Sequence, residues 1–378
     1  MAHNHLTWVE IDRAALRENL EAFRALVGPG VKLMSVVKSN AYGHGASTVA
    51  GVIQETGQAD WLGVNCLDEA LNLRAAGISL PILVLGYVPL TRLGEAAQQR
   101  LRITVINPAT ITALSRSKPR HKVRVHIKLE TGTHRLGLEL KEAKRLAAQV
   151  QRSQACVLEG YSTHFANIED TTDHSYATAQ LFKYERMVRA LEKCGYKAPL
   201  THVACTAAAL IFQETRRELV RIGIGLYGLW PSRETLISIR ERNLGIQLRP
   251  VASWKTRVAQ VKVIRAGSYV GYGCAYRATR KTRLAVLPVG YFDGLARSLN
   301  AAHVLIRGHR APIRGRICMN LCMVDVTDIR GVGLEDEVVL IGTQGKDRIT
   351  TEQLAGWIGT INYEVISRIN PVLPRVVI

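Results

Sequence analysis

Short apolar runs alternate with amphipathic segments over the first two thirds of the chain. Eight of these runs have the length and the β-branched content of buried strands, and segments with helical spacing of apolar residues separate them. The predicted strands are residues 31–37, 61–65, 82–85, 103–106, 123–129, 158–163, 200–204 and 219–223. Strands that alternate with helices form parallel βαβ units, and eight such units favour a closed β/α barrel of the TIM type.

An open doubly wound sheet is the main alternative to the barrel. The sequence contains no glycine fingerprint of the dinucleotide-binding type, which that alternative commonly carries. A helix is predicted over residues 14–27, with Asp12 as a possible cap and Gly28 as its end. A second helical segment, residues 46–55, follows the first predicted strand.

After about residue 241 the pattern of apolar and polar residues changes to one typical of short strands separated by turns. Strands are predicted at residues 254–264, 283–289, 303–306, 321–326 and 338–341. One helix interrupts them at residues 351–358, where Thr350 and Gln353 have capping-box spacing. We therefore expect residues 1–10 to form a strand that packs with the C-terminal domain, residues 11–240 to form the barrel, and residues 241–378 to form a mostly β domain.

Composition fits a two-domain globular protein of 378 residues with 47% hydrophobic content. No apolar run reaches the length of about 18 residues that spans a bilayer, and the first residues lack the features of a signal peptide. A cytoplasmic protein without a membrane partner is expected. The seven cysteines are scattered without CxxC spacing, which indicates neither a disulfide framework nor a metal site.

A formal charge of +19 is the outlier of the composition. Nucleic-acid binding would be one reason for such a charge. However, the 50 basic residues spread along the whole chain and aromatic residues make up only 6%. This pattern favours a solvated basic surface that attracts small anions, with no nucleic acid as partner.

The barrel predicts that the chemistry lies where strands end. Lys38 follows the first predicted strand, in the segment VVKSNAYGHG. Burial lowers the pKa of a lysine toward the neutral, nucleophilic amine that forms a Schiff base. A lysine that extends to water is the alternative.

The other predicted strand ends carry further chemically useful residue types. They are the segments KLETGTHR (128–135), YSTHFA (161–166), HVACT (202–206) and RIGIG (221–225). Together with Lys38 they supply an amine, an aromatic ring, fixed cations and a glycine-bearing turn whose N–H groups could hold a phosphate. These are the parts of a pyridoxal phosphate site.

Eight motifs in order, VVKSNAYGHG, KLETGTHRLG, YSTHFA, RIGIGLYG, GYGCAY, VGYFDG, GRICM and INYEV, resemble the alanine racemase family over essentially the whole chain. The resemblance implies a pyridoxal 5'-phosphate enzyme of fold type III. Its barrel would be followed by a β domain, and two subunits would share their active sites in a head-to-tail homodimer. The implied activity is the interconversion of L- and D-alanine, which supplies D-alanine for peptidoglycan. A racemase of broader specificity, for serine or basic amino acids, and a pyridoxal phosphate carrier protein are the alternatives.

The resemblance also implies the residues that move protons. Lys38 would form the Schiff base with the cofactor and act as acid and base on one face of the substrate Cα. Tyr272 of the other subunit would act on the opposite face, because one base alone returns its proton to the same side. His164 would be a hydrogen-bonding neighbour of Tyr272 and connect it to Arg221. Arg221 would face the pyridine nitrogen and keep its proton, which weakens the electron sink and favours racemisation.

The remaining implied residues bind the phosphate and the substrate. The family's phosphate contacts match Tyr42, Thr206, Gly223, Ile224 and Tyr363. Arg135 and the backbone of Met319 match contacts to the substrate carboxylate, Lys128 matches a lysine often carbamylated in the family, and Tyr291 matches an entry-gate tyrosine.

Three positions depart from the family pattern. Cys205 stands where an asparagine is common, Asn320 where an aspartate is usual, and Glu130 where the family has an aspartate. The change at Asn320 removes a carboxylate beside the entry, which could alter substrate preference or pH dependence.

Overall fold

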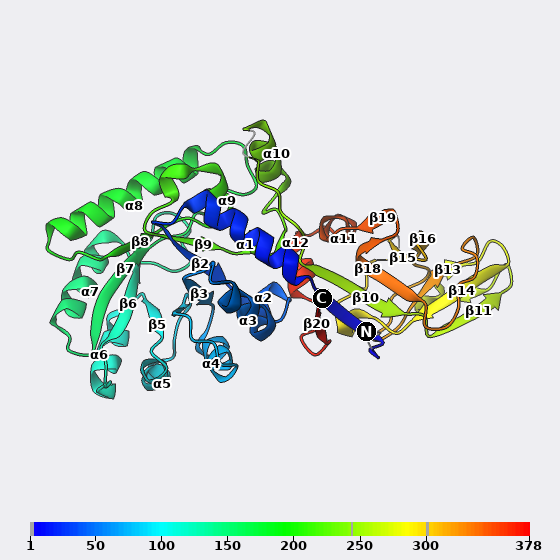
Figure 1. The fold of residues 1–378 in the computed structure, drawn as a ribbon, viewed down its shortest axis with the longest axis horizontal. Coiled ribbons are helices and arrows are strands. Elements are labelled where there is room, and N and C mark those ends of the chain that lie inside the picture. The colour runs from blue at the N-terminus through cyan, green and yellow to red at the C-terminus, as the bar shows by residue number, and fades with distance from the viewer. Residues whose placement is uncertain (1–3, 243–244, 300–301) are drawn as a thin grey trace. The chain divides into compact units, whose positions relative to one another are not determined.

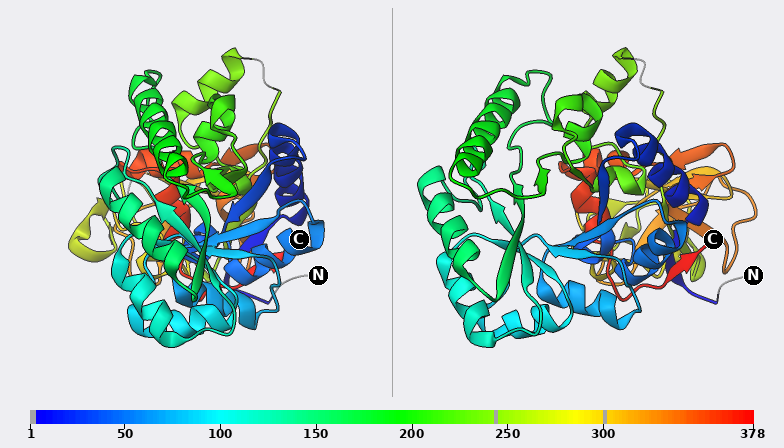
Figure 2. Two further views of the ribbon diagram at one scale, coloured as in Figure 1. Left: turned by 90° about the vertical axis from the view of Figure 1, so that its left-hand side faces the viewer. Right: turned by 60° about the vertical axis from the view of Figure 1, so that its left-hand side comes forward.

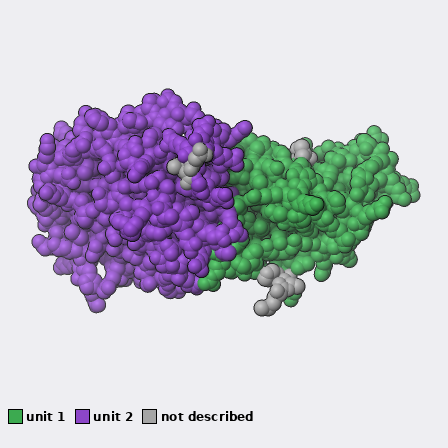
Figure 3. All heavy atoms as spheres, turned by 45° about the horizontal axis from the view of Figure 1, so that its top comes forward, with its two compact units in different colours: residues 1–13, 40–48, 250–378 green, residues 14–39, 49–249 purple. Residues whose placement is uncertain are grey.

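A computed structural model describes residues 4–242, 245–299 and 302–378. The chain forms two compact units, which Figure 3 colours separately. Residues 14–39 and 49–249 form one of them, which we call the barrel unit. Residues 1–13, 40–48 and 250–378 form the other, which we call the β unit.

The barrel unit contains eight parallel strands in the order β8-β7-β6-β5-β4-β3-β2-β9. Between β8 and β9, the backbone N–H of Arg221 donates to the carbonyl of Ala204 at 3.3 Å. The ends of all eight strands lie within two residues of the predicted ones, so the predicted barrel is confirmed. The strands are β2 (Lys32–Val36), β3 (Trp61–Val64), β4 (Ile82–Val84), β5 (Arg102–Val105), β6 (Val123–Lys128), β7 (Cys156–Ser162), β8 (Leu200–His202) and β9 (Leu219–Ile222).

Helices surround these strands on the outside, as the two views of Figure 2 show. In α1, Leu16, Leu20 and Phe23 are at most 1% exposed, and Gly28 ends the helix with φ of 79°, as the sequence predicts. The helices are α1 (Arg13–Val27), α3 (Ala46–Thr56), α4 (Leu67–Ala75), α5 (Leu93–Gln98), α6 (Pro108–Ser117), α7 (Leu140–Arg152), α8 (Ser175–Lys193), α9 (Thr206–Ile211) and α10 (Arg233–Glu241). No helix in the described part of the chain is long and apolar enough to cross a membrane.

Apolar and polar side chains share the barrel interior. Met34, Trp61, Leu83, Leu200 and Leu219 form one buried cluster, contributed by five different strands. The imidazoles of two histidines on β6 and β8 are also buried in this interior, with their rings 5.0 Å apart. A barrel core is usually filled by branched apolar residues, so buried imidazoles there need hydrogen-bond partners.

The β unit is built around a long sheet with the order β16-β15-β18-β10-β1-β20 (Figure 1). Its first strand, β1, pairs antiparallel with β10 and parallel with β20, so both ends of the chain lie in this sheet. The strands are β1 (Thr7–Ile11), β10 (Ala252–Arg257), β11 (Gln260–Ile264), β12 (Tyr269–Val270), β13 (Tyr276–Arg277), β14 (Thr282–Leu287), β15 (His303–Ile306), β16 (His309–Pro312), β17 (Cys322–Asp325), β18 (Glu337–Gln344), β19 (Asp347–Ile349) and β20 (Arg375–Val377).

The single strand predicted over residues 254–264 is wrong, because the structure divides it into β10 and β11. The two parts have different partners: β10 pairs with β18, and β11 pairs with β14. At the change, the N–H of Val258 bonds to Asp336 and the N–H of Ala259 bonds to Val286. The segment WKTRVAQVKVI mixes apolar and polar residues in a strand-like pattern on both sides of this point, so the pattern hid a change of sheet.

The helix of the β unit that the sequence predicts, α11 (Thr351–Ile358), has the predicted ends. The N–H of Gln353 donates to Thr350 Oγ1 at 3.1 Å, and the N–H of Thr350 donates to Gln353 Oε1 at 2.9 Å. This confirms the capping box. A short helix, α12 (Asn362–Ser367), follows it.

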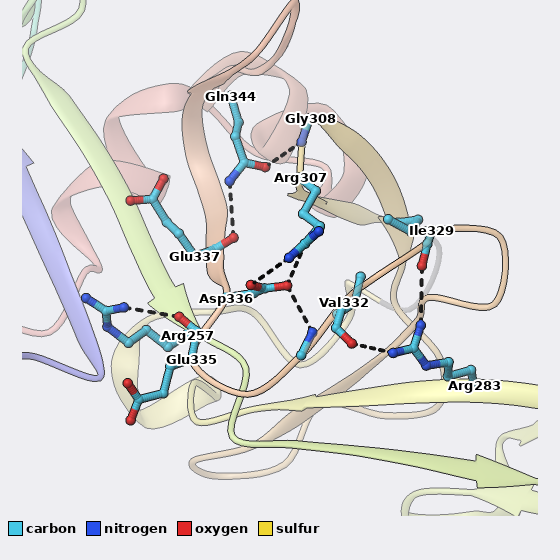
Figure 4. A network of polar contacts seen from close by, with 11 residues as sticks. Arg257, Arg283, Arg307, Gly308, Ile329, Val332, Glu335, Asp336, Glu337 and Gln344 are labelled. Atoms are coloured by element: carbon cyan, nitrogen blue, oxygen red, sulfur yellow. Dashed lines mark hydrogen bonds and ion pairs between the residues drawn. The ribbon is translucent and has the colours of Figure 1, made fainter.

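Polar contacts tie the loops of the β unit together, as Figure 4 shows. Asp336 accepts hydrogen bonds from Arg307 Nε at 2.8 Å and from the N–H of Gly333 at 3.0 Å. Gln344 accepts from the N–H of Gly308 and donates to the carbonyl of Glu337. These bonds satisfy loop backbone groups and serve a structural role.

Gly225 tests how tightly the barrel packs near the end of β9. A Cβ added there would lie 2.6 Å from a ring carbon of Phe23 and 2.6 Å from Cγ2 of Thr206. We expect Gly225→Ala to lower the free energy of unfolding by about 1–3 kcal/mol, because neither neighbour can move away without strain. Urea denaturation of the purified protein measures the change.

Gly51→Ala is the matched control. Gly51 lies inside α3, and a Cβ added there would have no neighbour outside the helix backbone within 4 Å, so alanine should stabilise the helix by about 0.5–1 kcal/mol. Equal and small effects of the two substitutions would contradict the packing described for Gly225.

Candidate active site

Lys38 lies where β2 ends in the barrel unit. The chain is fixed there on both sides: the N–H of Val37 donates to the carbonyl of Gly63, and the N–H of Ser39 donates to Glu69 Oε1. Partial burial lowers the pKa of Lys38, and the positive charge of Arg135 lowers it further. Both effects favour the neutral amine that a nucleophilic lysine needs.

The turn after Lys38 is left-handed over four consecutive residues. Residues 39–42 have φ between 52° and 54°, although none of them is glycine. Such residues cost about 1–2 kcal/mol each, so local bonds must hold the turn. Asn40 supplies two of them: its carbonyl accepts from the N–H of Gly45 and its Oδ1 accepts from the N–H of Ala46, both at 2.9 Å.

Three more cations belong to the same unit as Lys38. Lys128 at the end of β6 is partly buried, and burial together with the charges of Arg221, Arg135 and Lys38 lowers its pKa to about 8. Burial lowers the pKa of Arg221 to about 10, which still leaves it charged at neutral pH. In the described ranges none of the four forms an ion pair with a carboxylate. Such a group of cations is suited to bind an anion.

Arg221 is held in one orientation by acceptors of the barrel. Its Nη1 donates to His202 Nδ1 at 2.6 Å and to the carbonyl of His202 at 2.8 Å. Its Nη2 donates to the carbonyls of Thr163 at 2.8 Å and Val203 at 2.9 Å. Within the described part of the chain, Nε–H is the one donor of this guanidinium without a partner.

Thr206 joins the ends of β8 and β9. It is the first residue of α9, and its Oγ1 accepts from the N–H of Gly223 at 3.0 Å and from the N–H of Gly225 at 3.5 Å. A short 3₁₀ helix begins at Ile224, directly after Gly223. The structure therefore brings together the three residues of the barrel unit that the sequence predicts as phosphate contacts.

The loop that carries Arg135 is organised by Glu130. The Glu130 carboxylate accepts from the N–H of Gly132 at 2.6 Å. Burial opposes the charge of Glu130, but hydrogen bonds from loop N–H groups outweigh it and lower its pKa. Tyr176 also donates to the carbonyl of Gly132, so the loop presents Arg135 from a fixed backbone.

His164 and Arg135 line a hollow of about 360 Å³ in the barrel unit, together with Glu169, Asp170 and Cys205. Burial, then the charge of Arg221, lowers the pKa of His164 well below its usual range, so this imidazole is neutral. The sequence predicts that His164 connects to Arg221. No hydrogen bond joins their side chains in the described structure, and Arg221 acts on His164 by lowering the pKa of its imidazole.

Cys205 faces the acidic part of this hollow. Its thiol lies 3.8 Å from Glu169 Oε1, and burial followed by the charge of Glu169 raises its pKa to about 12. The thiol is therefore protonated and unreactive at neutral pH.

The other predicted site residues belong to the β unit. The rings of Tyr42 and Tyr363 are neighbours, with centroids 6.1 Å apart. Tyr291 and Met319 are 41% and 54% exposed, and lie on two adjacent segments joined by a bond from the N–H of Phe292 to the carbonyl of Met319. Tyr272 is 68% exposed.

Backbone geometry accounts for the exposed position of Tyr272. It sits between Gly271 and Gly273, which have φ of 73° and 70°. This is the left-handed region that favours glycine. The motif GYG therefore forms a sharp turn that presents the tyrosine.

Two buried polar residues near Arg221 were not predicted from the sequence. His126 lies inside β6 and Glu159 inside β7, and both are at most 5% exposed. An interruption of the β6–β7 register at this point breaks the alternation of inward and outward residues, so periodicity gave no signal for them.

Comparison with known proteins agrees with this geometry. Residues 11–231 match the family described as alanine racemase, N-terminal domain, and residues 251–377 match alanine racemase, C-terminal domain. The chain belongs to the alanine racemase family. The expected resemblance is thus confirmed over nearly the whole chain.

Individual relatives extend the match to full length. An alanine racemase of Desulfosudis oleivorans is 42% identical over 381 residues, covering 98% of this chain and 96% of the relative. The crystal structure of alanine racemase from Bacillus anthracis with bound L-Ala-P has a TM-score of 0.93 and 35% identity, covering 100% of this chain and 96% of that one. An alanine racemase of Clostridium difficile has the same TM-score at 32% identity, covering 100% of this chain and 97% of that one.

The pKa of Lys128 can be tested by competitive acetylation of the cofactor-free protein. The neutral fraction of the amine rises as pH increases through its pKa, so labelling should reach half its maximum near pH 8. A lysine in water reaches that point near pH 10.4. Peptide mass spectrometry measures the labelling, with the exposed Lys197 as internal reference.

Arg135→Gln removes one of the charges that lower the pKa of Lys128. We expect its labelling midpoint to move to higher pH in this variant. A midpoint near 10.4 in the wild type, or none of the expected movement in Arg135→Gln, would contradict the charge effect.

Proposed function

We propose that this chain interconverts L- and D-alanine with pyridoxal 5'-phosphate as cofactor, and so supplies D-alanine for peptidoglycan synthesis. The observation that carries the proposal is the position of Lys38, an amine with a lowered pKa, at the mouth of a barrel with three further cations. The full-length similarity to alanine racemases supports it. A cytoplasmic location stays a prediction from the sequence.

The residues present fit the cofactor. Lys38 would be its covalent anchor, and the unused Nε–H of Arg221 would donate to the pyridine nitrogen. Thr206, Gly223 and Ile224, with the hydroxyls of Tyr42 and Tyr363, would hold the phosphate through hydroxyl and backbone donors. When bound, pyridoxal phosphate withdraws electrons from the substrate and makes the proton on Cα more acidic.

Arg221 would limit that electron withdrawal. Its pKa stays well above neutral despite burial, so it donates a hydrogen bond to the ring nitrogen without giving up its proton. The weaker electron withdrawal would limit the build-up of negative charge on the substrate Cα. This favours racemisation over side reactions.

Two bases would serve the two faces of Cα. Lys38 would take or give the proton on one face, and Tyr272 of the partner subunit would do so on the other. The 68% exposure of Tyr272 supports an intersubunit role, because its own protomer leaves the ring in solvent. Tyr269 and Val263 nearby in the sequence are each 58% exposed, as in surfaces that a second subunit covers. The assembly would be a homodimer with shared active sites.

The substrate carboxylate would bind Arg135 and the backbone of Met319. The lowered pKa of Lys128 supports its carbamylation, because a neutral amine reacts with carbon dioxide. The resulting negative charge would position Arg135. Tyr291 would stand at the entry, beside Asn320, which is exposed and carries no charge.

Mixing two inactive variants tests the reaction and the shared site together. We expect Lys38→Ala and Tyr272→Phe each to lose nearly all formation of D-alanine from L-alanine. After subunit exchange, half of the dimers are mixed, and one of their two sites has both Lys38 and Tyr272. About a quarter of the wild-type activity should therefore return.

Wild-type protein taken through the same exchange is the control. No recovery of activity in the mixture, although each variant forms dimers, would show that both bases come from one chain. Absence of D-alanine formation by the wild type with pyridoxal phosphate would contradict the reaction itself.

A further inference from the structure

Three buried polar side chains continue from Arg221 into the interior of the barrel. His202 on β8, His126 on β6 and Glu159 on β7 are 1%, 0% and 5% exposed. Arg221 Nη1 lies 2.6 Å from His202 Nδ1, His202 Nε2 lies 2.9 Å from His126 Nδ1, and His126 Nε2 lies 3.1 Å from Glu159 Oε2. The reaction described above uses none of the last three residues directly.

The residues at the two ends of this hydrogen-bond series, Arg221 and Glu159, fix the direction of every hydrogen bond in it. Arginine can only donate, so His202 Nδ1 must accept and carries no proton. A neutral His202 is then protonated on Nε2 and donates to His126 Nδ1. His126 is in turn protonated on Nε2 and donates to Glu159, which as a carboxylate can only accept.

The charge states agree with this direction. Burial, then the charge of Arg221, lowers the pKa of His202 well below its usual range. Burial also lowers the pKa of His126, although its bond to Glu159 opposes the shift. Both rings are therefore neutral.

Glu159 is kept ionised at the far end of the chain. It accepts from Arg102 Nε at 3.1 Å and from Arg124 Nη1 at 2.8 Å, in addition to His126. Burial alone would raise its pKa, but the bonds from His126 and Arg124 outweigh burial and lower it. This carboxylate is a permanent acceptor.

Two local features of the backbone make room for these hydrogen-bonded side chains. The register of β6 and β7 shifts so that Val125 pairs with Leu158 and His126 pairs with Gly160, which leaves Glu159 as a bulge. Bulges redirect a side chain. At Gly160 a Cβ would lie 2.4 Å from His126 Nδ1, so a glycine is required beside the ring.

We propose that Glu159 and His126 are positioning residues for Arg221, because they hold His202 in the tautomer protonated on Nε2. In that tautomer His202 Nδ1 accepts from Nη1, and Nε–H of Arg221 is left for the ring nitrogen of the cofactor. The role at the cofactor rests on the proposed function. The assignment of the His202 tautomer does not depend on the proposed function.

The opposite tautomer would disturb Arg221 directly. It would place Nδ1–H of His202 against Nη1–H of Arg221 at 2.6 Å, two donors facing each other. Arg221 would have to turn, and its contacts to the barrel carbonyls would weaken. The acceptor at Nδ1 therefore depends on residues that never touch the cofactor.

Two variants of His126 of similar size test whether its side chain must accept from His202. In His126→Asn the amide oxygen takes the place of Nδ1 as an acceptor for His202, whereas His126→Leu leaves Nε2–H of His202 without a partner. We expect His126→Leu to lower kcat about tenfold, with KM for alanine changed less than twofold, and to shift the visible absorbance of the bound cofactor. His126→Asn should keep at least about half of kcat and the wild-type spectrum.

Circular dichroism and thermal unfolding of both variants show whether they fold. Equal losses in His126→Leu and His126→Asn, with both folded, would overturn the positioning role. A loss in KM alone would also overturn it.

A second measurement needs no turnover. In the full chain labelled with ¹⁵N-histidine and free of cofactor, the nitrogen shifts of His126 and His202 should show protonated Nε2 and unprotonated Nδ1. The shifts should stay constant from about pH 6 to about pH 8. Protonation of His202 on Nδ1, or on both nitrogens, would overturn the proposal. The predicted tautomers together with no racemisation would count against the proposed function alone.

Discussion

The site depends on the burial of cations where the barrel strands end, because burial takes their positive charge out of water. Lys38, Lys128 and Arg221 are partly or fully buried, and no ion pair with a carboxylate balances them in the described structure. The cost appears as lowered pKa values for all three. The same burial favours a neutral amine at Lys38, and the remaining positive charge suits the site to an anion.

The fold meets this cost with backbone groups and neutral rings. Carbonyls of β8 and of the segments after β7 and β8 accept from Arg221, and His202 supplies a lone pair without a charge. The nearest carboxylate in this chain of contacts is Glu159, two imidazoles away. Arg221 is thereby oriented without a direct counter-ion, so its positive charge is not neutralised within this set of contacts. The left-handed turn after Lys38 adds local strain that its hydrogen bonds must hold.

Much of the fold and of the candidate site could be predicted from the sequence. The apolar runs fixed all eight barrel strands, and Thr350 and Gln353 predicted the start of α11. Periodicity failed where the backbone leaves its regular pattern: at Val258, where the chain changes partner strand, and at Glu159, where a bulge turns a polar side chain inward. The left-handed turn at residues 39–42 had no glycine to indicate it. Resemblance to the family named residues for roles but gave no sign of His126.

The rate at which Lys38 captures pyridoxal, the cofactor without its phosphate, tests the central claim most directly. Pyridoxal has no phosphate to bind the phosphate contacts. The rate of its Schiff-base formation with cofactor-free protein, followed from about pH 6 to about pH 10, therefore depends on the protonation of the Lys38 amine. The account predicts a midpoint for Lys38 below the usual lysine value of about 10.4, and a rise of that midpoint in Arg135→Gln. A midpoint at the usual value that Arg135→Gln leaves unchanged would contradict it.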